Sequence, residues 1–485
     1  MKKYIIIIFV LTFAFGCEDL LDVKPISVIT TSSMWNSEGD ANGALNAMYS
    51  EFRAVFGNDL LVWGDCRGGK IGEGPNNNPA WLVNLKNNKL SRIDAGTDWQ
   101  GIYTIINSAN LILKYVPGIT LKKEEDKNFI LANAYFIRAF CYYWIARIWG
   151  DAPVITIPCE SSEQENLYPT RNPAIDVFNR IEEDIEKAIK LFPNDNVNPN
   201  VVGSKPAAYM LKTDFYLWMA KVQNKGKEAL TKAKEAIESV LANPNLGLNN
   251  NYDKVFRDEK NSEVIFALNY AINEATGGYP KYFLRERAKV ENQNLVENPI
   301  PVSNEAQWLA YTNEFRDFIY NKSYDSRAKV NFMTYYDEKY NIEHFWINKY
   351  IGEWINETRY FTSNIILYRY AEAILFKAEI ENALGNSQEA MNQLNLIAKR
   401  AYKIDDYYSG LSSIEIDEAI LEERLREFGS TEGKTWFDFI RFGVAFQKVQ
   451  SLIGRESEQN ILLWPVSSSS INTNPNITQT PGYDK

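Results

Sequence analysis

Two segments of the chain combine the side chains with which proteins hold sugars. The first, residues 63–84, offers Arg67, Asn76, Asn77, Asn78 and Trp81. The second, residues 269–294, offers Tyr279, Tyr282, Arg285 and Arg287 behind a Gly-Gly pair. Aromatic rings stack on the apolar C–H faces of sugars, while amide and guanidinium groups form hydrogen bonds with the hydroxyls. We therefore expect one exposed binding face with Trp81 and Tyr279 as its main stacking residues. The alternative for each ring is packing onto the scaffold.

Residue types that would support catalysis are sparse or unspecific. The single histidine, His344, argues against His-based metal sites and His-dependent triads. A glycoside hydrolase needs two carboxylates that flank a cleft. Among 62 Asp and Glu no short motif distinguishes such a pair, and Glu372, Glu379 and Glu422 lie on helical patterns where a solvated face is expected. We expect no enzyme and no cofactor, with a glycoside hydrolase as an alternative.

The charge balance and the cysteines exclude further classes of protein. A net charge of −10 without a basic cluster argues against nucleic-acid binding. Cys66, Cys141 and Cys159 lack metal-site spacing. An exported chain could pair two of them in a disulfide, but their spacing does not say which.

The N-terminus carries an export signal. Lys2 and Lys3 precede the apolar run Tyr4–Phe15, which is too short to span a bilayer. Gly16 and Cys17 follow, and a small residue, a glycine and a cysteine at this place resemble a bacterial lipoprotein signal in which Cys17 receives the lipid. The alternative is an ordinary secretory signal with an incidental Cys17. No second apolar run approaches membrane-spanning length, so the lipid alone would hold the protein to a membrane.

Helical periodicity accounts for most of the remaining chain. The expected helices cover residues 36–56, 98–116, 122–149, 173–192, 205–222, 227–241, 364–384, 387–402 and 414–428. We expect a strand at residues 264–268 and irregular, aromatic-rich structure at 269–363, apart from one helix face formed by Trp308, Tyr311, Phe315 and Phe318 that packs in the core.

Two helix pairs repeat one another. Residues 225–245 and 384–402 both show a glycine, polar residues, a Glu-Ala-apolar step and a second helix, and this resembles the tetratricopeptide repeat. We expect a mostly α-helical fold of four hairpins with a large loop-rich insertion. The pairs are 36–56 with 98–116, 122–149 with 173–192, 205–222 with 227–241, and 364–384 with 387–402. The hairpins form either a partner-binding array or only a scaffold.

Longer motifs carry a family resemblance. TSSMWNSEGDANGALNAMYSEF (31–52) and NAYFIRAFCYYWIARIWGDAPVI (133–155) precede AILEERLREFGSTEGKTWFDFIRFG (419–443) and LLWPVSSSSINTNPNITQTPGYDK (462–485). In this order they resemble the SusD/RagB family of Bacteroidetes surface lipoproteins over nearly the whole mature chain. GSTEG (429–433) departs from the family's Glu-Gly-His/Lys run. The resulting division is signal peptide 1–16, tether 17–35, N-terminal helical region 36–263, insertion 264–363 and C-terminal region 364–485.

The resemblance implies a role. Such proteins have no catalytic machinery, and they hold oligosaccharides, or peptides in RagB-like branches, over a SusC-like TonB-dependent transporter in the outer membrane, which they close as a lid. Glu18, Asp19 and Asp22 resemble the acidic tract that directs such lipoproteins to the cell surface, although a solvated tether would be equally acidic. A pure protein–protein scaffold is a further alternative.

Overall fold

The structure is a computed structural model. It describes residues 34–75, 80–197, 199–258, 261–290, 302–303, 307–339, 341–356 and 358–483, without the side chains of Asp337, Ile342 and His344. The predicted signal peptide, Cys17 with its acidic neighbours, and Asn76, Asn77 and Asn78 lie outside the described residues.

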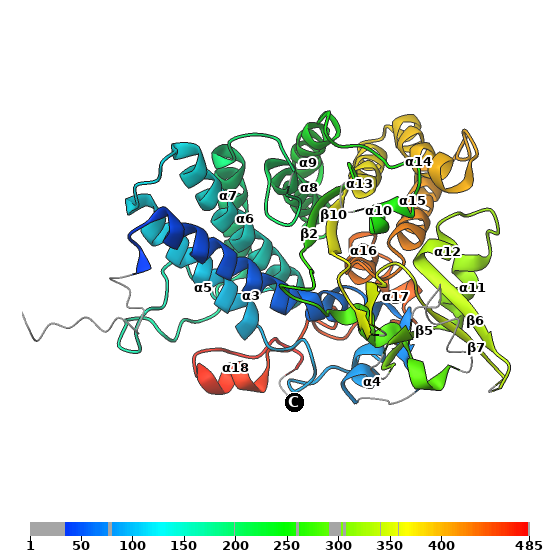
Figure 1. Cartoon of the computed structure of the whole chain (residues 1–485), viewed down its shortest axis with the longest axis horizontal. Coiled ribbons are helices and arrows are strands. Elements are labelled where there is room, and N and C mark those ends of the chain that lie inside the picture. Colours follow the sequence, from blue (N-terminus) through cyan, green and yellow to red (C-terminus); the bar gives the residue numbers. More distant parts are fainter. Residues whose placement is uncertain are drawn as a thin grey trace, which may run out of the picture.

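Four antiparallel helical hairpins form the main body, and all four predicted pairs are confirmed. The pairs are α3 (Glu38–Gly64) with α5 (Gln100–Tyr115), α6 (Glu124–Trp149) with α7 (Ala174–Leu191), α8 (Lys205–Lys221) with α9 (Gly226–Leu241), and α13 (Tyr370–Ala383) with α14 (Ser387–Tyr402). Each hairpin packs on the next, since α5 contacts α6, α7 contacts α8 and α9 contacts α13. The hairpins follow one another across the molecule in an arc (Figure 1).

Burial pattern explains why these segments are helical. In α7 the buried residues Val177, Phe178, Ile181 and Ile185 recur at steps of one helical turn, and the opposite face is solvated. Helix α6 differs, because neighbouring hairpins cover nearly all of its second half. It is the one helix of the described chain that is long and apolar enough to cross a membrane, and 83% of its most apolar stretch is buried inside the protein. That burial accounts for its apolar sequence.

Two boundaries differ from prediction. Helix α3 continues through Gly57 to Gly64, because Leu60, Leu61 and Trp63 are buried and the missing side chain of Gly57 admits the hydroxyl of Tyr270. The last helical hairpin does not begin at residue 364. Residues there form strand β10 (Ile365–Arg369), which pairs antiparallel with the predicted strand β2 (Val264–Leu268). Both strands are buried along their whole length, so their sequences are apolar without alternation.

The insertion consists of short elements packed beside the last two hairpins (Figure 1). Strand β1 (Ile71–Glu73) pairs with β5 (Leu309–Tyr311), β3 (Arg285–Glu286) with β4 (Val302–Ser303), β6 (Phe332–Asp337) with β7 (Ile342–Ile347), and β8 (Glu353–Ile355) with β9 (Thr358–Tyr360). Short helices join them: α10 (Lys254–Arg257), α11 (Asn313–Tyr320) and α12 (Ala328–Asn331), with 3-10 turns η3 (Tyr279–Phe283) and η4 (Arg287–Lys289).

The C-terminal region returns to the N-terminal helices. Helix α15 (Ser413–Phe428) packs on α13 and α14, and α16 (Thr435–Arg441) packs against α3 and α8. The chain continues through α17 (Ala445–Lys448), η6 (Gln450–Leu452) and α18 (Ser468–Thr473). Near the start of the chain, three short elements lie between the predicted helices. They are η1 (Cys66–Gly68), α4 (Ala80–Lys86) and η2 (Val116–Gly118).

Charged residues in this region correct one prediction. Glu372 and Glu379 are buried rather than solvated, and they form ion pairs with Arg424 and Arg441. Glu422 is partly exposed and pairs with Lys322 and Arg426. Periodicity placed these residues on helices correctly, but α15 and α16 cover the face that would otherwise be solvated.

The cysteines of the described residues are all free. Cys66 and Cys141 are buried, and Cys159 is exposed. The expected possibility of a disulfide between two of them is therefore not realised.

Candidate functional site

Backbone hydrogen bonds on both sides of Trp308 join the two predicted loop segments. Strand β1 comes from the first segment, and its partner β5 follows directly after Trp308. Beyond the end of β1, the amide of Gly74 donates a hydrogen bond to the carbonyl of Trp308, at 2.7 Å. The amide of Trp308 in turn donates to the carbonyl of Tyr282, at 3.1 Å. Residues more than 200 positions apart thus form one continuous surface.

An aromatic stack lies at this junction. The rings of Tyr282 and Trp308 are nearly parallel, with an interplanar angle of 6° and centroids 5.0 Å apart. Tyr282 is half-buried, and Trp308 exposes 39% of its surface. Lys281 Nζ lies 5.0 Å from the centroid of Tyr282, on the same turn. The backbone hydrogen bonds hold the two rings in place, so an apolar, flat surface is presented to solvent.

Trp81 lies on the helix that packs against β1, the strand that ends next to Trp308. It is the second residue of α4, it is half-buried, and α4 packs against β1. Lys86 on α4 forms an ion pair with Glu73 on β1, which fixes the helix to the strand. We name Tyr282 and Trp308, with Trp81 as a predicted third member, the aromatic platform. The stacking role of Trp81 stays a prediction, as does the role of the three asparagines that precede it.

The position of Trp308 corrects the expected helix face. Helix α11 begins only at Asn313, where the Thr312 hydroxyl accepts a hydrogen bond from the amide of Phe315. Trp308 therefore lies outside the helix, Tyr311 is on β5, and Phe315 is buried on α11 as expected. A helix-capping threonine four residues after the tryptophan was the sequence signal for this boundary.

Tyr279 is not exposed, and the expectation that it lies on the binding face is wrong. It exposes only 1% of its surface, and its hydroxyl donates to the carbonyl of Thr431. Burial raises the pKa of Tyr279 well above its ordinary value. Gly278, at φ 82°, turns the chain inward at this point, where a side chain would collide with Ile365.

Arg67 is buried as well, and each of its three nitrogens already donates a hydrogen bond within the protein. Its Nε donates to Asn88 Oδ1 at 2.7 Å, and its other nitrogens donate to the carbonyls of residues 461–463. The guanidinium carbon lies 4.2 Å from the centroid of Trp436. The residue that we expected to bind ligand instead holds the C-terminal segment in place.

The two arginines of the second segment also differ in position. Arg285 is buried on β3. Arg287 is half-exposed and lies 5.3 Å from the ring centroid of Trp354, which also contacts Arg359. The sequence predicted that both arginines share one exposed face with Tyr282. Instead, Arg285 is buried and Arg287 lies beside Trp354.

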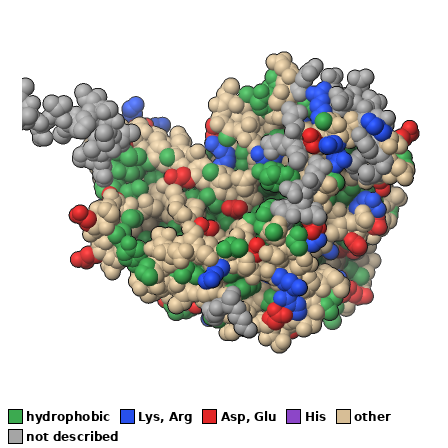
Figure 2. Space-filling view, turned by 90° about the horizontal axis from the view of Figure 1, so that it is seen from below, with side chains coloured by type: hydrophobic (Ala, Val, Ile, Leu, Met, Phe, Trp, Pro, Cys, Tyr) green, Lys and Arg blue, Asp and Glu red, His purple; other side chains and the backbone are tan. Residues whose placement is uncertain are grey.

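The surface around these elements is mixed in character. Figure 2 shows the face that carries α4, α18 and the C-terminal end in Figure 1. Apolar side chains lie there in small patches among polar and charged ones, rather than as one continuous apolar sheet. Such a surface suits a ligand that is itself polar with small apolar faces better than a lipid surface.

Comparison with known proteins identifies the family. A family model described as "Starch-binding associating with outer membrane" matches residues 75–217, and one described as "SusD family" matches residues 282–483. The chain belongs to the SusD family.

Similar proteins span the whole chain. A SusD-like protein of Formosa agariphila is 26% identical over the full length of both chains, and a second from the same organism is 26% identical over 93% of this chain and 92% of its own length. Among solved structures, B. fragilis NanU has a TM-score of 0.82 at 25% identity and covers 96% of this chain and 100% of its own. A SusD superfamily protein of Bacteroides vulgatus shares the fold, with a TM-score of 0.81 at 24% identity over 93% of this chain and 100% of its own.

Membership settles the fold and the coarse role. The mostly helical, hairpin-based fold with its insertion is that of the SusD superfamily. SusD proteins are nutrient-binding proteins associated with the outer membrane, and they bind rather than catalyse.

Proposed function

We propose that this SusD-family protein binds a nutrient oligosaccharide on the aromatic platform at the cell surface. It delivers the oligosaccharide to a SusC-like TonB-dependent transporter, which it closes as a lid. The observation that carries the ligand class is the parallel Tyr282–Trp308 stack with Trp308 open to solvent. A solvent-accessible aromatic ring that is held rigidly among polar groups is typical of a site at which a sugar ring stacks.

The platform is tested by truncating its rings. Trp308→Ala or Tyr282→Ala should weaken binding of the oligosaccharide by about 1–3 kcal/mol, which is the usual range for aromatic contact residues. Trp308→Ala should lower thermal stability only modestly because this ring is partly exposed, whereas Tyr282→Ala should lower it more because Tyr282 packs against the core. Calorimetry with a panel of neutral oligosaccharides and short peptides gives the affinity, and a melting series gives the stability.

A matched control comes from another exposed aromatic residue. Tyr168 exposes 54% of its surface on the segment between α6 and α7, and Tyr168→Ala should leave binding unchanged. Equal affinity of wild type and Trp308→Ala for every bound oligosaccharide would contradict the platform. Binding of peptides alone would instead favour the RagB-like alternative.

Anchoring at the cell surface is a separate part of the proposal. Lipid attachment to Cys17 should carry the protein into the membrane fraction, and Cys17→Ala should be exported but soluble without detergent. Co-purification of a large TonB-dependent transporter with the lipidated protein from native membranes supports the lid role. Membrane retention of Cys17→Ala would overturn the anchor.

We also infer that the protein does not cleave its ligand. Glu372 and Glu379 are engaged in buried ion pairs and are closed to substrate. An oligosaccharide incubated with the protein should be recovered intact by chromatography, and the appearance of shorter products would revive the hydrolase alternative.

A further inference from the structure

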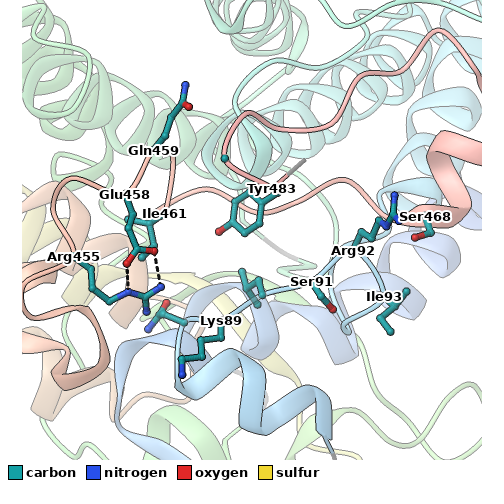
Figure 3. A pocket seen from close by; sticks show the side chains of 13 residues that line it. Lys89, Ser91, Arg92, Ile93, Arg455, Glu458, Gln459, Ile461, Ser468 and Tyr483 are labelled. Atoms are coloured by element: carbon teal, nitrogen blue, oxygen red, sulfur yellow. Dashed lines mark hydrogen bonds and ion pairs between the residues drawn. The ribbon is translucent and has the colours of Figure 1, made fainter. Parts of the chain in front are cut away.

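A separate pocket lies between the loop that follows α4 and the C-terminal segment of the chain. Its volume is about 680 Å³, and it opens between the loop of residues 88–93 and the segments around Arg455, Ile461 and Tyr483. None of the three platform residues lines it. We name it the C-terminal pocket, and Figure 3 shows it from close by.

Cationic side chains dominate the charged lining of the C-terminal pocket. The charged residues that line the pocket are the cations Lys89, Arg92 and Arg455 and one carboxylate, that of Glu458. Arg455 engages that carboxylate with two hydrogen bonds, of 2.6 and 2.8 Å. Lys89 and Arg92 are exposed, and within the described part of the chain neither has a carboxylate within ion-pair distance. The C-terminal pocket is therefore locally positive, although the chain as a whole carries a net charge of −10.

A buried cation, Arg67, adds to the positive electrostatic potential of the C-terminal pocket. Arg67 has no carboxylate partner among the described residues and is held by carbonyl oxygens and Asn88. Burial lowers the pKa of Arg67 to about 10, with nearby Arg455 contributing in the same direction and Tyr483 opposing it. Arg67 therefore stays charged at neutral pH and lies close enough to Arg455 and Tyr483 for its field to reach the pocket.

The uncharged lining suits a sugar. Tyr483 presents its ring between the Arg455–Glu458 pair on one side and Arg92 and Ser468 on the other (Figure 3). Its hydroxyl donates to the carbonyl of Leu463 at 3.0 Å, which fixes the ring. The side chains of Gln459 and Ser468 have no hydrogen-bond partner among the described residues, and both line the pocket. An aromatic ring, a hydroxyl, an amide and cations thus line one wide pocket, in which the side chains of Lys89 and Arg92 point to different sides (Figure 3).

We propose that the C-terminal pocket is a second saccharide site, and that it takes a sugar unit bearing a carboxylate or a sulfate ester. The sugar ring lies on Tyr483, Ser468 bonds one of its hydroxyls, and the positive field of Lys89 and Arg92 attracts the anionic group. The proposal rests on the proposed glycan-binding function and extends it from neutral to anionic glycans. Both anionic groups are hydrogen-bond acceptors that attract Lys and Arg, so the test must separate them.

The test compares two charge-matched double variants. Lys89→Gln/Arg92→Gln removes the free cations of the pocket. Lys225→Gln/Lys227→Gln removes two exposed lysines at the start of α9, which lies far from the C-terminal end in Figure 1, and changes the net charge equally. Three probes are titrated: an oligogalacturonate, a sulfated galactose oligosaccharide, and a neutral oligosaccharide from the panel above.

The expected result is selective. At low salt the pocket variant should bind one or both anionic probes about tenfold more weakly than wild type, since exposed charge pairs contribute modestly each. The loss should shrink at about 500 mM NaCl, where screening shortens the range of the field. The neutral probe should bind all three proteins alike. The probe with the larger loss identifies the carboxylate or the sulfate as the preferred group.

Two results would overturn the proposal. One is an equal loss in both double variants, which would mean that only the overall charge acts. The other is an absence of saturable binding of either anionic probe while the neutral probe binds. Failure of every probe on the wild type would instead count against the proposed glycan-binding function.

Discussion

At the scale of the single residue, Arg67 lies between the rings of Trp436 and Trp464 and caps the carbonyls of residues 461–463. A buried cation without a carboxylate is tolerated here because carbonyls, an amide and two aromatic faces replace water around it. The side chain connects η1, near the start of the chain, to a segment almost 400 residues later. Its role is structural.

The first prediction concerns this arginine. Arg67→Met keeps the length of the side chain but leaves the carbonyls unpaired, and each buried acceptor without a donor costs about 1–3 kcal/mol. We expect the free energy of unfolding in urea to fall by on the order of 3 kcal/mol, and limited proteolysis to cut within residues 450–483. Arg67→Lys should give an intermediate loss, since a single ammonium cannot reach all acceptors. Unchanged stability with lost glycan binding would restore the ligand-contact hypothesis.

The sequence predicted the positions of several candidate site residues incorrectly. Trp81 and Tyr282 are on or near the platform, whereas Tyr279 and Arg67 are buried and Trp308 was assigned to the core. Exposure in these loops depends on pairing between β1 and β5 and on the C-terminal segment that covers Arg67. Such contacts span 200 to 400 residues and leave no local periodicity to find.

At the scale of the element, the helices could be predicted from the sequence, but the strands and helices that pack against them could not. Steps of three and four residues placed α14 correctly at Ser387–Tyr402, and the hairpin partners followed from chain order. The same periodicity misassigned β10, because a strand buried on both faces is as apolar as a core helix. It also placed Glu379 on a solvated face, where α16 in fact supplies Arg441.

The second prediction uses this buried carboxylate. Burial alone would raise the pKa of Glu379, but Arg441 and Lys221 outweigh it and lower the pKa from 4.5 to about 2. A carboxyl whose pKa is depressed by folding stabilises the protein above its unfolded pKa and loses that contribution as pH falls toward the folded pKa. The contribution is about 3 kcal/mol at pH 7, of which about 2 kcal/mol should be lost by pH 3.

Urea unfolding at several pH values measures this pH dependence of the free energy of unfolding. Glu379→Gln should be destabilised by about 3 kcal/mol at pH 7, and its deficit relative to wild type should narrow between pH 4.5 and pH 2. Glu235→Gln, on the exposed face of α9, is the matched control and should follow wild type throughout. A constant deficit of Glu379→Gln at all pH values would show that packing, not charge, accounts for it.

At the scale of the whole molecule, the arc of hairpins is closed by the returning C-terminal region. The amide of Trp464 donates to the carbonyl of Ile148 at 2.8 Å, and Trp149 Nε1 donates to the carbonyl of Pro465 at 3.0 Å. Arg171 reaches the carbonyl of Thr478 at 3.1 Å. An open solenoid would unfold repeat by repeat. This closure should couple the two ends, and the C-terminal pocket is lined by residues from both of them.

The tightest part of that seam is the contact between the end of α3 and the segment that departs from the family pattern. Asp65 accepts hydrogen bonds from the amides of Gly433 and Thr435, at 2.7 and 3.1 Å. Gly64 lies directly against the backbone of Gly433, where a Cβ would overlap the carbonyl. Two glycines therefore let the chain's beginning and end approach backbone to backbone.

The last prediction compares two glycines of the same helix. Gly64→Ala must push the 429–433 segment away from α3, and overpacking against backbone should destabilise the protein by on the order of 3 kcal/mol. Gly43→Ala, also in α3, meets nothing within 4 Å and should stabilise it by about 0.5 to 1 kcal/mol through better helix propensity. If the seam couples the whole molecule, Gly64→Ala should still melt in one transition by calorimetry, only at a lower temperature. A second transition at lower temperature, confined to the C-terminal region, would show that the hairpins stay folded without the seam. Equal stability of the two variants would show that the contact between Gly64 and Gly433 is loose.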